Sequence, residues 1–94
     1  MTDIISALES TLIERKNNPS SASYTAQLFA AGEDEIVKKI GEEAVEIILA
    51  AKGQGDQRVV EESADLVYHL IVLLISRGLS WMDIESELSR RAAR

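Results

Sequence analysis

The stretch that decides the fold is residues 33–78, which read EDEIVKKIGEEAVEIILAAKGQGDQRVVEESADLVYHLIVLLISRG. Acidic residues open this stretch, and they suit the positive end of a helix dipole. Gly53-Gln54-Gly55-Asp56 interrupts it with residues that end one helix and begin another. We therefore expect two long helices, over about 33–52 and 57–77, folded back on each other at this turn, with Asp56 capping the second.

Shorter helices are expected on both sides of this pair. Apolar residues recur at helical spacing over about 2–16, and a polar segment that contains the only proline breaks the pattern. Ser23 can cap a short helix over about 24–31. Ser80 and Asp83 have the spacing of a capping box at the start of a last helix. The sequence thus predicts an all-α fold, an antiparallel helical bundle.

The segment Leu66–Ile75 is apolar on almost every side. Helices of that kind are buried all round in folded proteins. A chain of 94 residues has only a modest core of its own, and association with a second copy is a common source of further stability. We therefore expect homodimerisation to complete the bundle.

The composition narrows the class of protein. The length fits one domain over residues 1–94, and the absence of cysteine excludes disulfides and thiolate chemistry. A formal net charge of -6 argues against nucleic acid as the main partner. No signal peptide is visible, and no apolar run approaches the ~20 residues that span a bilayer. We expect a cytoplasmic protein with no membrane partner.

Acidic residues gather on the helix pair in two groups. The first group reads EExxE and comprises Glu42, Glu43 and Glu46; the second reads ExxD and comprises Glu62 and Asp65. Residues three or four apart share a helix face, so the turn would bring Glu43, Glu46, Glu62 and Asp65 together. Like charges ~4 Å apart repel by ~1 kcal/mol in water and by several times that near a protein surface. A cation would relieve this repulsion, and oxygen ligands suit Mg²⁺ or Mn²⁺.

A solvated acidic helix face is the alternative to a metal site, and it is the commoner fate of charge runs. Both acidic groups adjoin apolar residues, which places them at the border of the core and favours the metal site. A di-iron bundle needs Glu-x-x-His on two helices. The only histidine, His69, has no glutamate three residues before it, so we expect it to pack or hydrogen-bond near the helix interior.

Several other side chains are candidate contacts for a phosphate-bearing substrate. Lys38, Lys39 and Lys52 lie on the helix of the first acidic group, where a cation can meet a phosphate. Surface solubility is the alternative for each lysine. The segment Ser23-Tyr24-Thr25 offers hydroxyl groups and one aromatic ring, with a helix cap and a core tyrosine as the alternative. We expect Trp81 to be a packing anchor.

The segments Ser23-Tyr24-Thr25, KKIGEEAVE at 38–46, AAK at 50–52 and EESADLVYH at 61–69, together with Gly32, carry a family resemblance. Taken together, they closely resemble the phosphoribosyl-ATP pyrophosphohydrolases, which belong to the all-α MazG-like superfamily with the signature EExxE…ExxD. The resemblance covers about residues 20–74.

This resemblance implies an enzyme that hydrolyses 1-(5-phosphoribosyl)-ATP to the AMP derivative and pyrophosphate, the second step of histidine biosynthesis. It implies a homodimer in which Mg²⁺ is held by Glu43, Glu46, Glu62 and Asp65. Glu42 would be a further ligand or the base, and the three lysines would offset phosphate charge.

Two other functions stay open at this point. A housekeeping NTP or dUTP pyrophosphohydrolase would use the same carboxylates with a different pocket for the base and sugar. A non-catalytic helical dimerisation module would carry the acids only as a solvated face.

Overall fold

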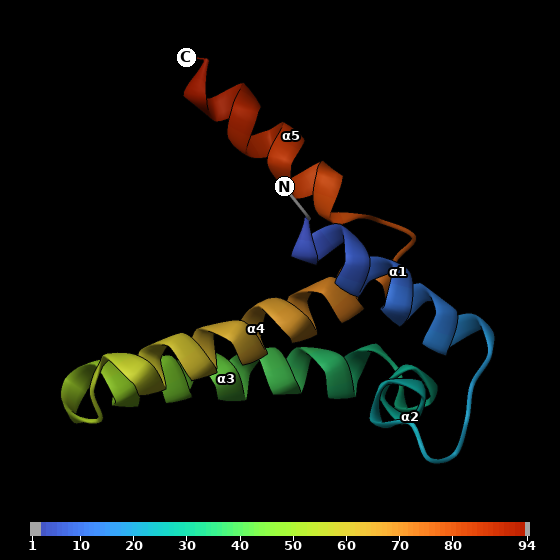
Figure 1. Ribbon diagram of the computed structural model, residues 1–94, viewed down its shortest axis with the longest axis horizontal. Helices are drawn as coiled ribbons and strands as arrows, with labels where there is room; N and C mark the ends of the chain where they lie inside the picture. The colour runs from blue at the N-terminus through green and yellow to red at the C-terminus, as the bar shows by residue number, and fades with distance from the viewer. Residues whose placement is uncertain (1–2, 94) are drawn as a thin grey trace.

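The computed structural model describes residues 3–93, and helices account for almost all of this range (Figure 1). The prediction of an all-α fold is confirmed, since no strand occurs within 3–93. The helices are α1 (Ile4–Asn17), α2 (Tyr24–Ala31), α3 (Glu33–Gly53), α4 (Asp56–Ser76) and α5 (Trp81–Ala92).

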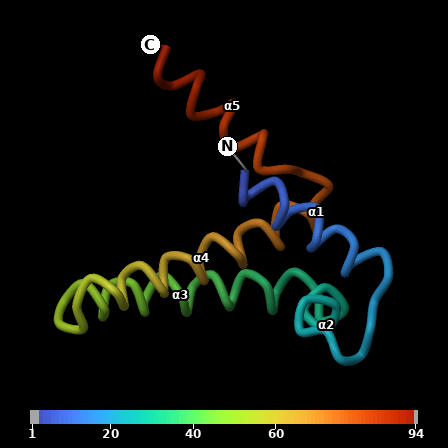
Figure 2. Tube along the Cα trace, viewed as in Figure 1, coloured from blue at the N-terminus to red at the C-terminus, as the bar shows by residue number. Residues whose placement is uncertain are grey.

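The two long helices, α3 and α4, lie side by side and run in opposite directions around the turn at Gln54-Gly55 (Figures 1 and 2). α1 and α2 pack at the end of this hairpin away from the turn. α5 projects away from the hairpin and has no buried residue. The expected helix pair is therefore the central element of the fold, and α1 and α2 cover one end of it.

The helix starts follow the predicted capping residues with one exception. The Ser23 hydroxyl accepts a hydrogen bond from the Ala26 N–H, and the capping box of Ser80 and Asp83 opens α5. The prediction that Asp56 caps α4 is wrong, because the helix already includes it. Gly55, with φ of 89°, takes the cap position instead, since glycine adopts this left-handed conformation without a side-chain clash.

The first helix begins at Ile4 in the structure, whereas the sequence suggested a start near Thr2, which lies outside the described residues. Asp3 is its N-cap, and its carboxylate accepts hydrogen bonds from the Ile5 and Ser6 N–H groups. α1 is thereby held by a capping interaction that the sequence analysis did not use.

A single apolar core joins α1, α2, α3 and α4. Its buried members are Leu12, Leu28, Ile36, Ile71, Val72 and Ile75. No residue of Leu66–Ile75 is exposed, so one chain alone covers more of this segment than its sequence suggested. Trp81 packs against the core, which confirms its expected role as an anchor.

Among the helices, α3 carries the largest group of exposed large apolar residues. Val37, Val45, Ile48 and Leu49 form an outer stripe on this helix, with 44–58% of each residue exposed. The radius of gyration is 14.6 Å, whereas a compact domain of this length has about 12 Å. The chain is therefore more open than a self-sufficient globule. Within 3–93, no helix is long and apolar enough to cross a membrane.

Candidate active site

Three carboxylates converge where α3 faces α4. Glu43 comes from α3, and Glu62 and Asp65 come from successive turns of α4. Carboxylate oxygens of the three side chains lie within 4.8 Å of one another. Glu62 is buried, Glu43 is half-buried and Asp65 is exposed, so the group sits at the edge of the core with one side open to solvent. The structure thus brings together three of the four carboxylates expected to bind a metal.

The fourth carboxylate, Glu46, lies near this group but is not part of it. It is half-buried on α3, and three helical residues carry it about 60° around the axis from Glu43. Glu42 is exposed and forms an ion pair of 3.6 Å with Lys39. Glu42 adjoins Glu43 in the chain and Glu46 lies one helical turn beyond it, and the roles of both stay predictions.

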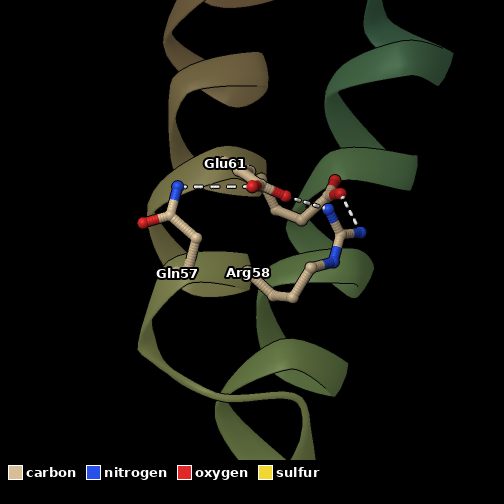
Figure 3. A network of polar contacts seen from close by, with 4 residues as sticks. Gln57, Arg58 and Glu61 are labelled. Carbon is tan, nitrogen blue, oxygen red and sulfur yellow. Dashed lines mark hydrogen bonds and ion pairs between the residues drawn. The ribbon is translucent and has the colours of Figure 1, made fainter.

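Arg58 provides the nearest positive charge on α4. Its guanidinium donates to Glu62 at 2.6 Å and also pairs with Glu61, which accepts a further hydrogen bond from Gln57 (Figure 3). Arg58 therefore compensates the charge of the buried Glu62 carboxylate. Glu43 and Asp65 receive no such compensation from an arginine or lysine among the described residues.

The electrostatic cost of this arrangement appears at Glu43. Desolvation raises the pKa of its carboxyl group, and the neighbouring Asp65, Glu62 and Glu42 carboxylates raise it further, while His69 opposes them. A carboxyl group that resists ionisation beside other carboxylates gains from a bound cation, because the cation stabilises the charged form.

His69 is buried, and its imidazole links the carboxylates to α2. Its Nδ1 lies 2.9 Å from a Glu43 oxygen and 3.1 Å from the Asp65 backbone carbonyl, and its Nε2 lies 2.9 Å from the Tyr24 hydroxyl. The expectation that His69 packs and hydrogen-bonds near the helix interior is confirmed. Its contact with Glu43 was missed, although the four-residue spacing from Asp65 placed it on the same helix face.

The segment Ser23-Tyr24-Thr25 reaches this region through two residues. Tyr24 contacts His69, and the Thr25 hydroxyl hydrogen-bonds the Tyr68 hydroxyl. Ser23 serves as the cap of α2 and also lines a hollow of about 350 Å³ between α1 and α2. Its lining includes Glu14 but none of the five carboxylates of the acidic motif, so it is not the pocket in which the motif acts.

Two of the three candidate lysines, Lys38 and Lys52, lie within about 40° of each other around α3, and Lys39 lies about 100° from Lys38. Lys39 is half-buried beside Glu42, whereas Lys38 and Lys52 are exposed. Lys52 follows Glu43 by nine residues and so lies about half a turn around the helix from it. Among the three lysines, only Lys39 forms an ion pair with an acidic residue of the motif within the described residues of one chain.

The three converging side chains fit an oxygen-liganded divalent cation. Around an octahedral Mg²⁺ ion with bonds of ~2.1 Å, opposite ligand oxygens are about 4.2 Å apart. The limit of 4.8 Å observed here exceeds that value by an amount that small side-chain rotations can close. A purely carboxylate donor set suits Mg²⁺ or Mn²⁺ better than metals that prefer nitrogen or sulfur.

Comparison with known proteins gives one consistent family. Residues 5–92 match the family described as Phosphoribosyl-ATP pyrophosphohydrolase. The chain is 51% identical to the "Phosphoribosyl-ATP pyrophosphatase" of Pelotomaculum thermopropionicum. The 89 aligned residues cover 95% of this chain and 91% of that protein. Proteins with the same name match from Lactiplantibacillus plantarum, 50% identical over 78 residues (83% of this chain, 74% of that protein), and from Pyrobaculum aerophilum, 50% identical over 88 residues (94% of each). The chain belongs to the phosphoribosyl-ATP pyrophosphohydrolase family.

Proposed function

We propose that this chain is a Mg²⁺-dependent phosphoribosyl-ATP pyrophosphohydrolase. It hydrolyses the α–β phosphoanhydride of 1-(5-phosphoribosyl)-ATP and releases 1-(5-phosphoribosyl)-AMP and pyrophosphate, the second step of histidine biosynthesis. The observation that carries the proposal is the convergence of Glu43, Glu62 and Asp65 in a chain of this family.

Glu43, Glu62 and Asp65 would hold the metal ion, and Glu46 is the adjacent candidate for a fourth ligand. Mg²⁺ is the ion we expect, and Mn²⁺ would use the same oxygens. When bound, the ion neutralises phosphate charge and makes a water molecule more acidic. Without a cation, these carboxylates would repel a substrate that carries several negative charges of its own.

The remaining residues of the motif act on the water and on the polyphosphate. Glu42 adjoins Glu43 in the chain and Glu46 lies one helical turn beyond it, so these two are the candidates to accept a proton from the attacking water. The water oxygen bonds to the α-phosphorus, the bridging oxygen between the α- and β-phosphorus atoms leaves with its electron pair, and pyrophosphate departs. Lys39 lies 3.6 Å from Glu42, where a cation can offset charge on the phosphates.

Substitution of the converging carboxylates tests this proposal. Glu62→Gln and Asp65→Asn keep the shape of each side chain and remove its charge. We expect each to lower kcat/KM for phosphoribosyl-ATP on the order of 10²–10³-fold, as when one electrostatic contact to a transition state is removed. Glu61→Gln is the matched control, since Glu61 adjoins Glu62 but points to Arg58 and lies outside the group. Full activity of the two variants, in protein with unchanged helicity, would contradict the proposed site.

We also propose that the protein acts as a homodimer. The outer stripe of α3 is an apolar surface that is exposed to water in a single chain. It consists of Val37, Val45, Ile48 and Leu49. A two-fold arrangement of α3 against α3 would bury this surface in both copies. The open shape of one chain supports the same arrangement.

A cytoplasmic location and a small nucleotide as the only substrate class complete the proposal. The acidic balance of the chain, with a formal net charge of -6, supports a small-molecule substrate over nucleic acid.

A further inference from the structure

The imidazole of His69 is the point where three helices meet beside the carboxylates. His69 belongs to α4, and it contacts Glu43 of α3 and Tyr24 of α2. Only 6% of the residue is exposed. The proposed reaction gives this buried polar group no part, yet every nitrogen of its ring has a partner.

The partners of the ring determine where its proton lies. The Asp65 backbone carbonyl can only accept a hydrogen bond, and it lies 3.1 Å from Nδ1. Nδ1 must therefore carry the proton, and this nitrogen also lies 2.9 Å from a Glu43 carboxylate oxygen, within ion-pair distance. In the neutral ring Nε2 is then an acceptor, and the Tyr24 hydroxyl donates to it at 2.9 Å.

We propose that His69 is a positioning residue that fixes the orientation of the metal ligand Glu43 and couples it to α2 through Tyr24. The inference rests on the proposed metal site. A glutamate carboxylate turns freely about its last torsion unless a donor holds it. The buried Nδ1–H bonds the Asp65 carbonyl and lies beside the Glu43 oxygen, so it can restrain that carboxylate as well. Polar contacts of this kind to a metal ligand support both its geometry and the affinity of the site.

The hydrogen bond between Tyr24 and His69 connects the position of α2 to the orientation of Glu43. Tyr24 is the first residue of α2, and 49% of it is exposed. A change in the position of α2 therefore moves the Tyr24 hydroxyl, then the His69 ring, and then the Glu43 carboxylate. The second contact between α2 and α4, from Thr25 to Tyr68, reaches no carboxylate and provides a comparison.

Two amide substitutions separate the roles of the two ring nitrogens. In His69→Asn the amide nitrogen is bonded to Cγ, as Nδ1 is, so the donor to Glu43 is kept. In His69→Gln the amide group lies one bond further out, near the position of Nε2, so that donor is lost. We expect the dissociation constant for Mn²⁺, titrated into metal-free protein without substrate, to rise roughly 10–100-fold in His69→Gln and to stay within about threefold in His69→Asn.

Tyr24→Phe tests the coupling to α2. We expect it to weaken Mn²⁺ binding up to about threefold in the wild-type background, the limit set for His69→Asn, which loses the same hydroxyl contact. In His69→Asn it should have no further effect, because the partner of the hydroxyl is already gone. Tyr68→Phe is the matched control, because it removes the other hydroxyl contact with α2 and should leave Mn²⁺ affinity unchanged. Circular dichroism and thermal melting establish that each variant is folded.

Different results of these experiments would overturn the role of His69 and the proposed function. Equal Mn²⁺ affinity in His69→Asn and His69→Gln, whether both are normal or both are weak, would overturn the positioning role. A Tyr24→Phe effect no larger than that of Tyr68→Phe would overturn the coupling. Because Mn²⁺ binding needs no nucleotide, a wild-type protein that binds Mn²⁺ but does not hydrolyse phosphoribosyl-ATP would refute the proposed function alone.

Discussion

Replacement of Ile48 by alanine should weaken the proposed homodimer by an amount that the structure allows us to calculate. Ile48 is 58% exposed on the outer stripe of α3, so a partner would have to complete its burial. Complete burial of an isoleucine side chain contributes about 1.5–3 kcal/mol, and alanine lacks three of its four carbons. Only the 58% of Ile48 that is exposed in one chain would be newly buried in the dimer. Removing three of the four side-chain carbons therefore costs roughly 0.7–1.3 kcal/mol of dimer stability for each copy of the chain.

A two-fold dimer contains Ile48 twice, so the total loss is about 1.3–2.6 kcal/mol, or roughly a 10–70-fold increase in the dimer dissociation constant. Alanine favours helix more than isoleucine does, so the fold of each chain should persist. Sedimentation velocity over a dilution series measures the dissociation constant directly. Ile13→Ala is the control, since Ile13 is a 42% exposed isoleucine on α1, outside the stripe.

Two results would refute this reasoning. One is a wild-type protein that stays monomeric at every concentration tested. The other is a dimer whose dissociation constant is the same in Ile48→Ala and in the wild type. An equal effect of Ile13→Ala would show that the loss is not specific to the outer stripe.

Three further predictions concern the carboxylates and the core. The pKa of Glu43 is raised above its ordinary value of 4.5, so the folded state binds a proton more tightly than the unfolded chain, and the stability of the metal-free protein should fall as the pH rises through the folded pKa. Glu43→Gln should remove this slope and raise Tm at neutral pH in EDTA; a Tm difference that is independent of pH would contradict the assignment. Arg58 pairs with Glu62 and so competes with a metal ion for it; we expect Arg58→Gln to lower the Tm of the metal-free protein and to tighten Mn²⁺ binding in a titration, whereas weaker binding would exclude competition. Ile71 is completely buried, so Ile71→Ala should lower the free energy of unfolding in urea by about 2–5 kcal/mol, and a loss below about 1 kcal/mol would place Ile71 outside the main core.

The helices and their order could be predicted from the sequence because the signals are local. Ser23 and the Ser80–Asp83 pair are capping residues that act within one turn of chain. The one error, at Asp56, arose where glycine and aspartate both suit a helix start, and the choice between them depends on the backbone conformation of the turn.

The acidic group could be predicted in outline but not in full. Helical spacing identifies which carboxylates share a face, and it correctly placed Glu43 beside Glu62 and Asp65. It does not give the rotation of α3 relative to α4, which depends on how core side chains such as Ile36 interlock. That rotation brings Glu43 into the group and leaves Glu46 at its border.

Contacts between distant segments were not accessible from spacing. Tyr24 and His69 are 45 residues apart, and no local pattern predicts that their side chains meet. The expected dimer surface is a similar case. The apolar character of Leu66–Ile75 suggested that a partner covers α4, whereas the packing of α1, α2 and α3 covers much of that segment and leaves the apolar stripe on α3 exposed.

Release of pyrophosphate from phosphoribosyl-ATP is the measurement that tests the account most directly. The assay compares phosphoribosyl-ATP with ATP and a panel of dNTPs, first with Mg²⁺ and then with EDTA. We expect turnover of phosphoribosyl-ATP alone, and only when Mg²⁺ is present. Turnover of dNTPs alone would instead make the chain a housekeeping nucleotide pyrophosphohydrolase, and no turnover by folded dimeric protein would reduce the carboxylates to a charged surface.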